Sequence, residues 1–324
     1  MLKLRVAHHE VPHLLPLLDG TVRPEGIDLD FELGQPGSLF HRHMDTNEFD
    51  VFEFSISDFL IIRDRPQMAH LDWTGIPIFY SRAFLGLNTV VNVNAGIESF
   101  ADLGGKCFGI PDFTMTAGLW LRAMLDSLYG IRAQDIGWYV GRSRETSHGV
   151  QMGLDEDPPP GLQLTWLENF SVLNRMLHAG QIQAAYGATE DPIEPGPAIR
   201  PLLRDGGREF VGSFFRKTGF TPVNHVLVMQ RRIAESEPWV PMALYEAFER
   251  SKQEAYRRNP PSAALFTGDD LDAQLSFYGS DPYPSGLSAN RSMLKMAARQ
   301  SLAEGLTRKL ADVDGLFWES VRGT

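Results

Sequence analysis

Hydroxyl side chains stand in two places where the sequence is expected to pass from a strand into a helix. Thr114 and Thr116 lie between a short apolar strand and an amphipathic helix. Ser55 and Ser57 open another helix in the same way. The start of a helix leaves backbone N–H groups without partners and carries partial positive charge. These positions therefore predict two sites for a carboxylate or a similar anion; the alternative is that the side chains only cap their helices.

Arg82 and Glu53 are charged residues whose surroundings suggest chemistry. Arg82 precedes the apolar stretch 84–93, and a guanidinium can hold a carboxylate through two parallel hydrogen bonds. The alternative for Arg82 is an internal ion pair. Glu53 lies in the apolar stretch 51–54, where burial would raise the pKa of its carboxyl and keep it protonated near neutral pH. Strand alternation also allows Glu53 to face solvent.

Histidines gather in the N-terminal third of the chain. His8 and His9 follow the first expected strand, and because successive residues point to opposite sides we expect only one of them, His8, to face a ligand. A divalent ion held by His8 or Glu10 is an alternative, although no HExxH or CxxC spacing occurs. Trp120 and Tyr186 could stack on an aromatic ligand, although such residues more often belong to the core.

The composition limits the classes of partner. The chain has 324 residues and a net charge of −11, which argues against nucleic acid or an anionic membrane as partner. Its single cysteine, Cys107, excludes an intrachain disulfide. No apolar run is long enough to span a bilayer. The chain begins directly with a strand-like pattern and no apolar signal core, so we expect a cytoplasmic protein.

Strands and helices are expected to alternate, which favours an α/β fold with mostly parallel sheets. The expected strands are 2–7, 27–33, 50–54, 73–79, 84–93, 136–140, 183–187 and 225–230, and residues 105–111 are expected to form a loop that enters a further short, buried strand. The expected helices are 11–18, 40–47, 58–65, 170–179, 238–258 and 291–304, with a further helix beginning near Thr116.

The order of these elements suggests two α/β lobes. Residues 1–90 and 193–324 are expected to form lobe 1, and residues 91–192 an inserted lobe 2. The long strand 84–93 and the proline-rich segment 192–201 would connect the lobes. Ligands of open α/β sheets bind beyond the carboxyl ends of the strands, so we expect a ligand cleft between the lobes.

Several segments along nearly the whole chain carry a common pattern. They are Arg23–Ile27, Glu48–Val51 with Ser55 and Ser57, Ser81–Phe84, Asp102–Lys106, Thr116–Arg122, His225 with its strand, Pro238–Val240 and Asp281–Pro284. Together and in this order, they resemble the 4,5-dihydroxyphthalate decarboxylase family. That family is similar in fold to type II periplasmic solute-binding proteins.

The resemblance implies a two-lobed, type II periplasmic-binding-protein-like α/β fold and an enzyme without an organic cofactor. The reaction would be decarboxylation of a hydroxylated aromatic acid such as 4,5-dihydroxyphthalate, by protonation of a ring carbon and loss of CO2. The resemblance also favours His225 as a proton donor or ligand contact. With Glu53, His225 then forms the pair of candidate catalytic residues.

Other functions remain open on the same scaffold. One is a non-catalytic solute-binding protein of an ABC-type transporter for a small carboxylate, and another is a different lyase such as a dehydratase. Segments 8–10, 112–115 and 142–147 depart from the family pattern and would line the cleft, which leaves the exact acid open. The expected partner is a small anionic aromatic ligand, and a homo-oligomer is compatible with the sequence.

Overall fold

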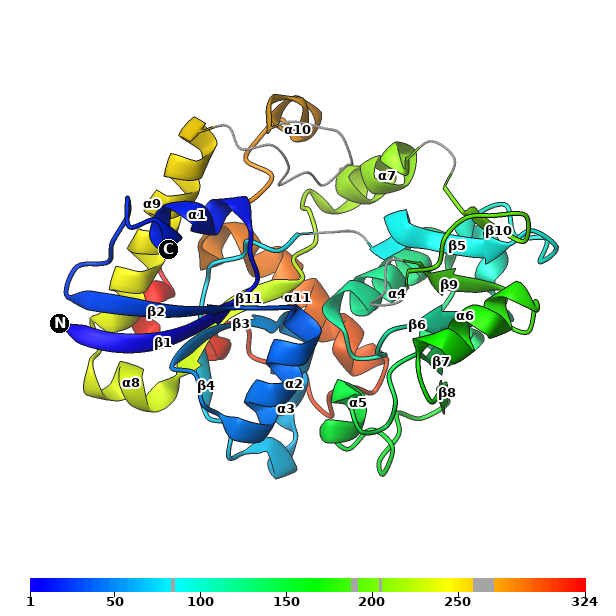
Figure 1. Cartoon of the computed structure of the whole chain (residues 1–324), viewed down its shortest axis with the longest axis horizontal. Coiled ribbons are helices and arrows are strands. Elements are labelled where there is room, and N and C mark those ends of the chain that lie inside the picture. The colour runs from blue at the N-terminus through cyan, green and yellow to red at the C-terminus, as the bar shows by residue number, and fades with distance from the viewer. Residues whose placement is uncertain (83–84, 188–191, 204–205, 259–270) are drawn as a thin grey trace. The chain divides into compact units, whose positions relative to one another are not determined.

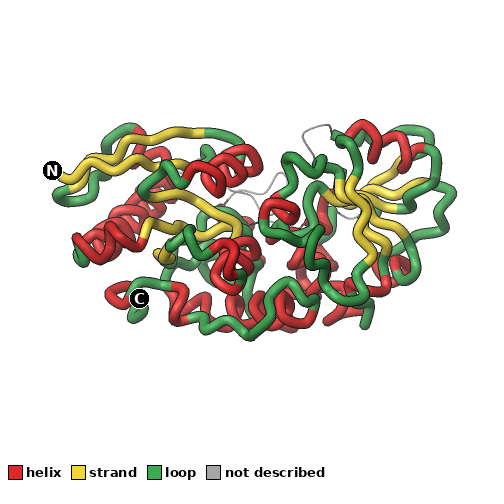
Figure 2. The backbone as a smooth tube through the Cα atoms, turned by 90° about the horizontal axis from the view of Figure 1, so that it is seen from below, coloured by secondary structure: helices red, strands yellow, loops and turns green. Residues whose placement is uncertain are grey.

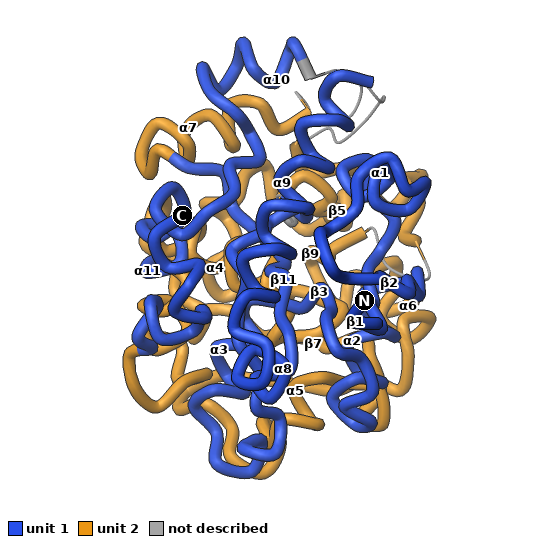
Figure 3. The backbone as a smooth tube through the Cα atoms, turned by 90° about the vertical axis from the view of Figure 1, so that its left-hand side faces the viewer, with its two compact units in different colours: residues 1–83, 220–296, 311–324 blue, residues 84–219, 297–310 orange. Residues whose placement is uncertain are grey.

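The computed structural model of the protein describes residues 1–82, 85–187, 192–203, 206–258 and 271–324. Contacts within the chain divide it into two units, which are coloured separately in Figure 3. Unit 1 comprises residues 1–83, 220–296 and 311–324, and unit 2 comprises residues 84–219 and 297–310. Both ends of the chain therefore belong to unit 1.

A mixed sheet of five described strands is the centre of unit 1 (Figures 1 and 2). The strands are β1 (Leu2–His8), β2 (Ile27–Leu33), β3 (Val51–Ser55), β4 (Trp73–Ile76) and β11 (His225–Gln230), in the order β2-β1-β3-β11-β4. β1 is parallel to β2 and β3, whereas β11 is antiparallel to β3 and β4. Every residue of β3 is buried, so polar side chains on this strand need partners inside the protein.

Helices complete unit 1, and several of them pack their apolar residues against this sheet. They are α1 (Leu15–Leu18), α2 (Pro36–Thr46), α3 (Ile56–Asp64), α8 (Arg231–Ser236), α9 (Val240–Arg258), α10 (Leu271–Tyr278) and the first part of α11 (Leu287–Ala303). In α9, Val240, Leu244 and Phe248 recur at helical spacing, and all three are buried. They join Leu4 and Val6 of β1 in one hydrophobic cluster, which fixes α9 on the sheet.

Unit 2 contains a second mixed sheet, of six described strands. They are β5 (Thr89–Asn92), β6 (Cys107–Ile110), β7 (Gly137–Val140), β8 (Gln163–Trp166), β9 (Ala184–Tyr186) and β10 (Ile199–Pro201), in the order β10-β5-β9-β6-β7-β8. β9, β6, β7 and β8 are parallel, whereas β5 is antiparallel to β9 and β10. The helices of this unit are α4 (Thr116–Tyr129), α5 (His148–Gln151), α6 (Phe170–His178) and α7 (Arg208–Thr218).

The structure corrects several expectations about the strands. Most strands of each sheet run in one direction, as expected, but β11 in unit 1 and β5 in unit 2 run against both of their neighbours. The expected strand 84–93 begins only at Thr89, since Leu85–Asn88 form a 3-10 turn; Phe84 lies outside the described residues. The segment 192–201 does not connect the units, because Ile199–Pro201 pairs with β5 inside unit 2.

The pairing of β5 and β10 also explains where the chain divides. Contacts place the division after residues 83 and 219, whereas the order of the expected elements predicts it after residues 90 and 192. Residues 297–310 are assigned to unit 2, although the whole C-terminal part is expected in lobe 1.

Within the described residues, no helix combines the length and the hydropathy that crossing a membrane requires.

An ion pair between Arg122 and Glu304 holds the end of α11 against the rest of unit 2. Both side chains are buried, with 0% and 2% exposure. Nε and Nη2 of Arg122 donate to the two carboxylate oxygens of Glu304 at 2.8 and 2.9 Å. The guanidinium carbon of Arg122 also lies 3.9 Å from the centre of the Phe113 ring. A buried charge without a partner lowers the stability of the folded protein. The ion pair therefore favours the position of the end of α11 beside α4.

Replacing Arg122 by methionine is expected to lower the free energy of unfolding by about 3–5 kcal/mol, because Glu304 then stays buried without a counter-charge. Urea unfolding followed by circular dichroism measures the loss. Arg132→Met, which removes an exposed pair with Asp135, is the control and should cost about 1 kcal/mol or less. Equal losses in the two variants would contradict the structural role of Arg122.

His43 of α2 is a core histidine. Its side chain is buried, and its ring stacks on Trp73 with centroids 5.0 Å apart. The backbone N–H of Phe49 donates to Nδ1 of His43 at 3.3 Å, which requires a lone pair on that nitrogen. Burial lowers the pKa of His43 to about 3, so the imidazole is neutral in the folded protein.

This neutral histidine predicts a loss of stability in acid. As the pH falls from 6.5 towards about 3, the unfolded chain binds a proton at His43 that the folded protein does not bind. The contribution of His43 is therefore complete above pH 6.5 and declines below it, by about 1.4 kcal/mol per pH unit. His43→Phe should flatten the dependence of the unfolding free energy on pH by this amount. Denaturation at a series of pH values measures it, and identical slopes for parent and variant would refute the assignment.

Candidate active site

The sheet of unit 1 reverses its strand order between β1 and β3. From β1 the chain passes to β2 on one side and returns to β3 on the other. Ligands of open α/β sheets bind outside the carboxyl ends of the strands at such a point. The parallel register of β1 with β3 places His8 beside Glu53. β11 runs in the opposite direction, so its first residue, His225, lies at the same edge.

The carboxylate of Glu53 is the centre of this edge. Its side chain is 3% exposed, and each of its oxygens has an imidazole partner. Oε1 lies 2.8 Å from Nδ1 of His225, and Oε2 is in direct contact with Nδ1 of His9. Oε2 also accepts the backbone N–H of His9 at 3.2 Å and lies 3.4 Å from Nδ1 of His8. One buried carboxylate is thus surrounded by three histidines, which we call the Glu53 cluster.

Glu53 is ionised, which corrects the expectation that it holds a proton. Burial alone would raise the pKa of its carboxyl, but the attraction of His8, His225 and His9 and the hydrogen bond from His225 lower that pKa well below its usual range. An ionised carboxylate only accepts hydrogen bonds, so Nδ1 of His9 and Nδ1 of His225 each carry a hydrogen. Nε2 of each ring is then the atom that can exchange a proton with a ligand.

His8, which the sequence analysis expects to face the ligand, is the most buried histidine of the cluster. Its side chain is 2% exposed, against 22% for His9 and 17% for His225. Nδ1–H of His8 donates to the backbone carbonyl of His9 at 2.7 Å. Burial lowers the pKa of His8 although Glu53 acts in the opposite direction, so the ring is neutral. Direct contact between His8 and a ligand stays a prediction.

His9 is the member of the cluster that the sequence analysis did not select. Strand alternation turns it away from His8, but β1 ends at His8, so alternation no longer applies to His9. Burial alone would lower the pKa of His9, yet the attraction and hydrogen bond of Glu53 raise it. One feature of the sequence could have indicated His9. Two histidines stand together at the end of the first strand, and the apolar strand that pairs with this strand contains a glutamate.

Ser55 and Ser57 lie at the start of α3, at the same edge of the sheet. Oγ of Ser55 accepts the backbone N–H of Asp58 at 3.2 Å, so Ser55 caps the helix. Ser57 is buried in the first turn of α3. The capping alternative therefore describes Ser55, and anion binding by either serine stays a prediction.

Arg82 lies in unit 1 and its guanidinium bonds to groups of the same unit. Nη1 donates to the carbonyl and the hydroxyl of Thr221 at 2.8 and 3.1 Å. Nη2 donates to the carbonyl of Pro284 and to Oδ1 of Asn290, both at 2.8 Å. Burial lowers the pKa of Arg82 to about 10, and the side chain is buried. The guanidinium therefore ties three segments together, and its role as a carboxylate clamp stays a prediction.

Arg82→Met is expected to lower the free energy of unfolding by about 3 kcal/mol, because the acceptors in Thr221 and Asn290 lose their donor and the carbonyl of Pro284 keeps only the amide of Asn290. Chemical denaturation measures this loss, and an unchanged midpoint would contradict it. Calorimetric titration of the folded variant with an aromatic dicarboxylate tests the ligand role separately. An affinity loss of about tenfold, or about 1.4 kcal/mol, would support a clamp, and unchanged affinity would leave Arg82 with the structural role alone.

In unit 2, Thr114 and Thr116 lie at the carboxyl edge of β6. Both are buried, and the N-cap of α4 is Met115 without a side-chain capping bond, so the expected capping by a threonine is wrong. The N–H and the hydroxyl of Thr114 instead both lie 3.4 Å from Oδ1 of Asp112. Asp112 also accepts the backbone N–H of His148 at 2.8 Å. Anion binding by these threonines stays a prediction.

The two aromatic candidates, Trp120 and Tyr186, differ in exposure. Trp120 lies in α4 with 0% exposure, so its ring belongs to the core of unit 2 and has no exposed face. Tyr186 ends β9 and is partly exposed. Burial raises the pKa of its hydroxyl, which keeps Tyr186 a hydrogen-bond donor at neutral pH. The expectation that Trp120 stacks on a ligand is therefore wrong, because the ring is enclosed by the core, whereas stacking of Tyr186 stays a prediction.

A metal ion is an alternative occupant of the Glu53 cluster. Donor atoms of His8, His9 and Glu53 lie within 4.8 Å of one another, whereas Glu10 is exposed and outside this group. Nδ1 of His9 and Oε2 of Glu53 are already in direct contact, while two ligands of a common ion lie about 3 Å apart. Hydrogen bonds therefore account for the observed geometry, and a divalent ion stays a prediction.

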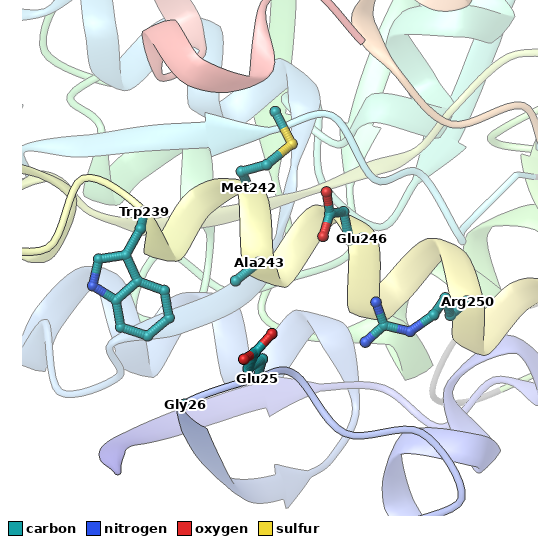
Figure 4. Close-up of a pocket in the computed structure, with 7 residues that line it drawn as sticks. All are labelled: Glu25, Gly26, Trp239, Met242, Ala243, Glu246 and Arg250. Atoms are coloured by element: carbon teal, nitrogen blue, oxygen red, sulfur yellow. The ribbon is translucent and has the colours of Figure 1, made fainter.

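A groove at the opposite edge of this sheet is not part of the candidate site (Figure 4). Its volume is about 680 Å³, and residues 25–26 and the start and middle of α9 line it. Gly26 directly precedes β2, so the groove lies at the amino-terminal edge of the parallel strands. The indole of Trp239 lies next to Gly26, where a Cβ would come within 3.1 Å of the ring. The groove therefore lies away from the cluster and from the edge where α/β sheets bind ligands.

Solved structures with the same fold define the class of protein. The aliphatic sulphonate binding protein SsuA of Escherichia coli matches with a TM-score of 0.55 and 15% identity over 100% of both chains. The ligand-binding component of an ABC-type import system from Staphylococcus aureus matches with 0.54 and 11% over 100% of this chain and 98% of the other. The desulfurization enzyme DSZB matches with 0.51 and 14% over 98% and 97%. The protein thus has the α/β fold of periplasmic binding proteins, as expected.

Sequence relatives identify the family within this class. The 4,5-dihydroxyphthalate decarboxylase of Comamonas testosteroni is 28% identical over 327 aligned positions, which cover 98% of this chain and 96% of the relative. The 4,5-dihydroxyphthalate decarboxylase of Pseudomonas putida is 30% identical over 206 positions, covering 63% of this chain and 78% of the relative. No protein-family model matches the chain. The chain belongs to the 4,5-dihydroxyphthalate decarboxylase family, which confirms the resemblance found in its sequence.

Proposed function

We propose that the protein decarboxylates a hydroxylated aromatic acid such as 4,5-dihydroxyphthalate without an organic cofactor. The Glu53 cluster, at the carboxyl edge of a sheet in a member of this decarboxylase family, is the observation that carries the proposal. The proposed partner is a small anionic aromatic ligand. A cytoplasmic location and a homo-oligomeric state remain further parts of the proposal.

Decarboxylation of such an acid requires a proton at a ring carbon. A hydroxyl group ortho or para to the carboxylate supplies electrons to the ring, and the carbon that bears the carboxylate takes up a proton. The bond to the carboxylate then breaks, CO2 leaves, and the electron pair of that bond restores the aromatic ring. The protein must therefore supply a proton donor of suitable pKa, in a place from which water is largely excluded.

The Glu53 cluster can supply this proton. Glu53 is ionised and holds His9 and His225 through their Nδ1–H groups, so a second proton on Nε2 makes an imidazolium beside a carboxylate. A carboxylate that orients an imidazole and stabilises its protonated form is a recurrent arrangement in general acid–base catalysis. Both rings are partly exposed, so a ligand can reach them.

A solute-binding protein of a transporter is the second candidate function. The fold supports it, because SsuA and the import-system component from S. aureus are binding proteins by name. The same fold also occurs in DSZB, an enzyme, so the fold alone does not decide between binding and catalysis. Turnover is therefore the property to measure.

The purified protein should release CO2 from 4,5-dihydroxyphthalate, with consumption of the acid followed by ultraviolet absorbance. Activity is expected to persist after treatment with a chelator, since the proposed chemistry needs no metal. Glu53→Gln should reduce kcat by about 100-fold or more, because the amide no longer stabilises an imidazolium.

Glu32→Gln, at a partly exposed position of β2 where the side chain pairs with Arg42, is the matched control and should retain the parent activity. Tight binding of aromatic acids without any turnover would support the solute-binding alternative instead. Loss of activity on chelation that added metal restores would support the divalent ion.

A further inference from the structure

We propose that the two partly exposed histidines of the Glu53 cluster have opposite roles: His9 donates a proton to the ring carbon, and His225 accepts the proton of the hydroxyl group para to that carbon. The assignment rests on the proposed function, because it concerns a hydroxylated aromatic acid. It extends that function from a single proton donor to an acid and a base that share one carboxylate.

The geometry brings both rings within reach of one small ligand. Each ring is bound to Glu53 through Nδ1, His9 on Oε2 and His225 on Oε1. The ring centroids are 5.8 Å apart and the ring planes are nearly perpendicular, at 87°. This separation is comparable to the span of one hydroxylated benzene ring. His8, the third ring, is 2% exposed and its Nδ1–H is held by a backbone carbonyl, so it takes no part in the exchange.

The contacts of the carboxylate indicate which ring is the acid. Oε2 receives two N–H groups from His9, one from the ring and one from the backbone, whereas Oε1 receives the ring N–H of His225. The negative charge therefore favours an imidazolium at His9. The shift in the pKa of His9 agrees with this assignment, because Glu53 raises that pKa although burial acts to lower it. The remaining ring, His225, takes the base role in this assignment: its Nδ1–H is bound to Oε1, so Nε2 is the atom that would accept the proton.

One buried carboxylate explains why an acid and a base would be paired. Glu53 is 3% exposed, so it needs a positive charge nearby at each stage of the reaction. When His9 has given its proton to the ring carbon, His225 has gained one from the hydroxyl group. The cluster thus contains one imidazolium and one carboxylate before and after the transfer, whereas a lone acid would leave Glu53 uncompensated.

The proton and electron balance of this reaction closes. Nε2 of His225 takes the hydroxyl proton, and the electron pair of the resulting phenolate shifts through the ring to form the bond between the ring carbon and the proton from Nε2 of His9. The bond to the carboxylate breaks, its electron pair returns through the ring to the phenolate oxygen, and CO2 leaves as a neutral molecule. His225 returns its proton to that oxygen, and His9 regains a proton from water.

Two matched variants, His9→Asn and His225→Asn, test the assignment. The asparagine amide can replace the Nδ1–H donor to Glu53 and removes Nε2, so it separates proton transfer from the structural bond. We would measure kcat with 4,5-dihydroxyphthalate and with a ring-nitrated analogue whose hydroxyl group is already ionised. In a second measurement, the decarboxylated product would be incubated with each variant in D2O, and deuterium uptake at its ring carbon would be followed.

His9→Asn is expected to lose about 100-fold or more in kcat with both acids and to lose deuterium uptake. His225→Asn is expected to lose as much kcat with 4,5-dihydroxyphthalate. With the ionised analogue, which needs no base, the loss of kcat relative to the unchanged protein should be smaller by at least about tenfold. The reverse pattern would overturn the assignment of roles. Losses that do not depend on hydroxyl acidity in either variant would overturn the acid–base pair as a whole.

Controls separate this inference from the proposed function. His41→Asn, at a partly exposed position of α2 beside Asp45, should behave like the unchanged protein. Thermal unfolding checks that each variant folds, and His9→Gln and His225→Gln replace any asparagine variant that does not. Absence of CO2 release by the unchanged protein would refute the proposed function. CO2 release with the wrong dependence on hydroxyl acidity would refute only the division of roles.

Discussion

The negative charge of Glu53 is the constraint on which the candidate site depends. A carboxylate with 3% exposure receives almost no stabilisation from water, so charges and hydrogen bonds of the protein must replace it. Histidines provide this stabilisation on both oxygens. Unlike arginine, a histidine can gain and lose its charge near neutral pH. The interaction that allows a carboxylate in the core therefore also keeps protons transferable at this edge of the sheet.

The order of strands explains how such a cluster arises. Glu53 bonds to His9 across 44 residues of sequence and to His225 across 172 residues. β1 and β3 end at this edge, while the antiparallel β11 begins there, so three distant segments meet. An all-parallel sheet would have placed the start of β11, and with it His225, at the opposite edge.

Arg82 shows that burial of a charge does not by itself create a reactive site. Its guanidinium is buried like the carboxylate of Glu53, but its hydrogen bonds go to carbonyl, hydroxyl and amide oxygens. Those partners do not titrate, so they hold segments together without offering a proton. The fold is likewise shared by binding proteins and by an enzyme, so the fold alone does not decide the chemistry.

From the amino-acid sequence we could predict the fold class, the family, most of the strands and helices, and three members of the Glu53 cluster, namely Glu53, His225 and His8. These follow from local periodicity and from segments that resemble the family, and both are properties of neighbouring residues. Three features are visible only in the folded chain: Glu53 is ionised, His9 is its closest partner, and Arg82 bonds within unit 1. Each of these depends on groups far apart in the chain, because electrostatic energy in the core is set by distance in space.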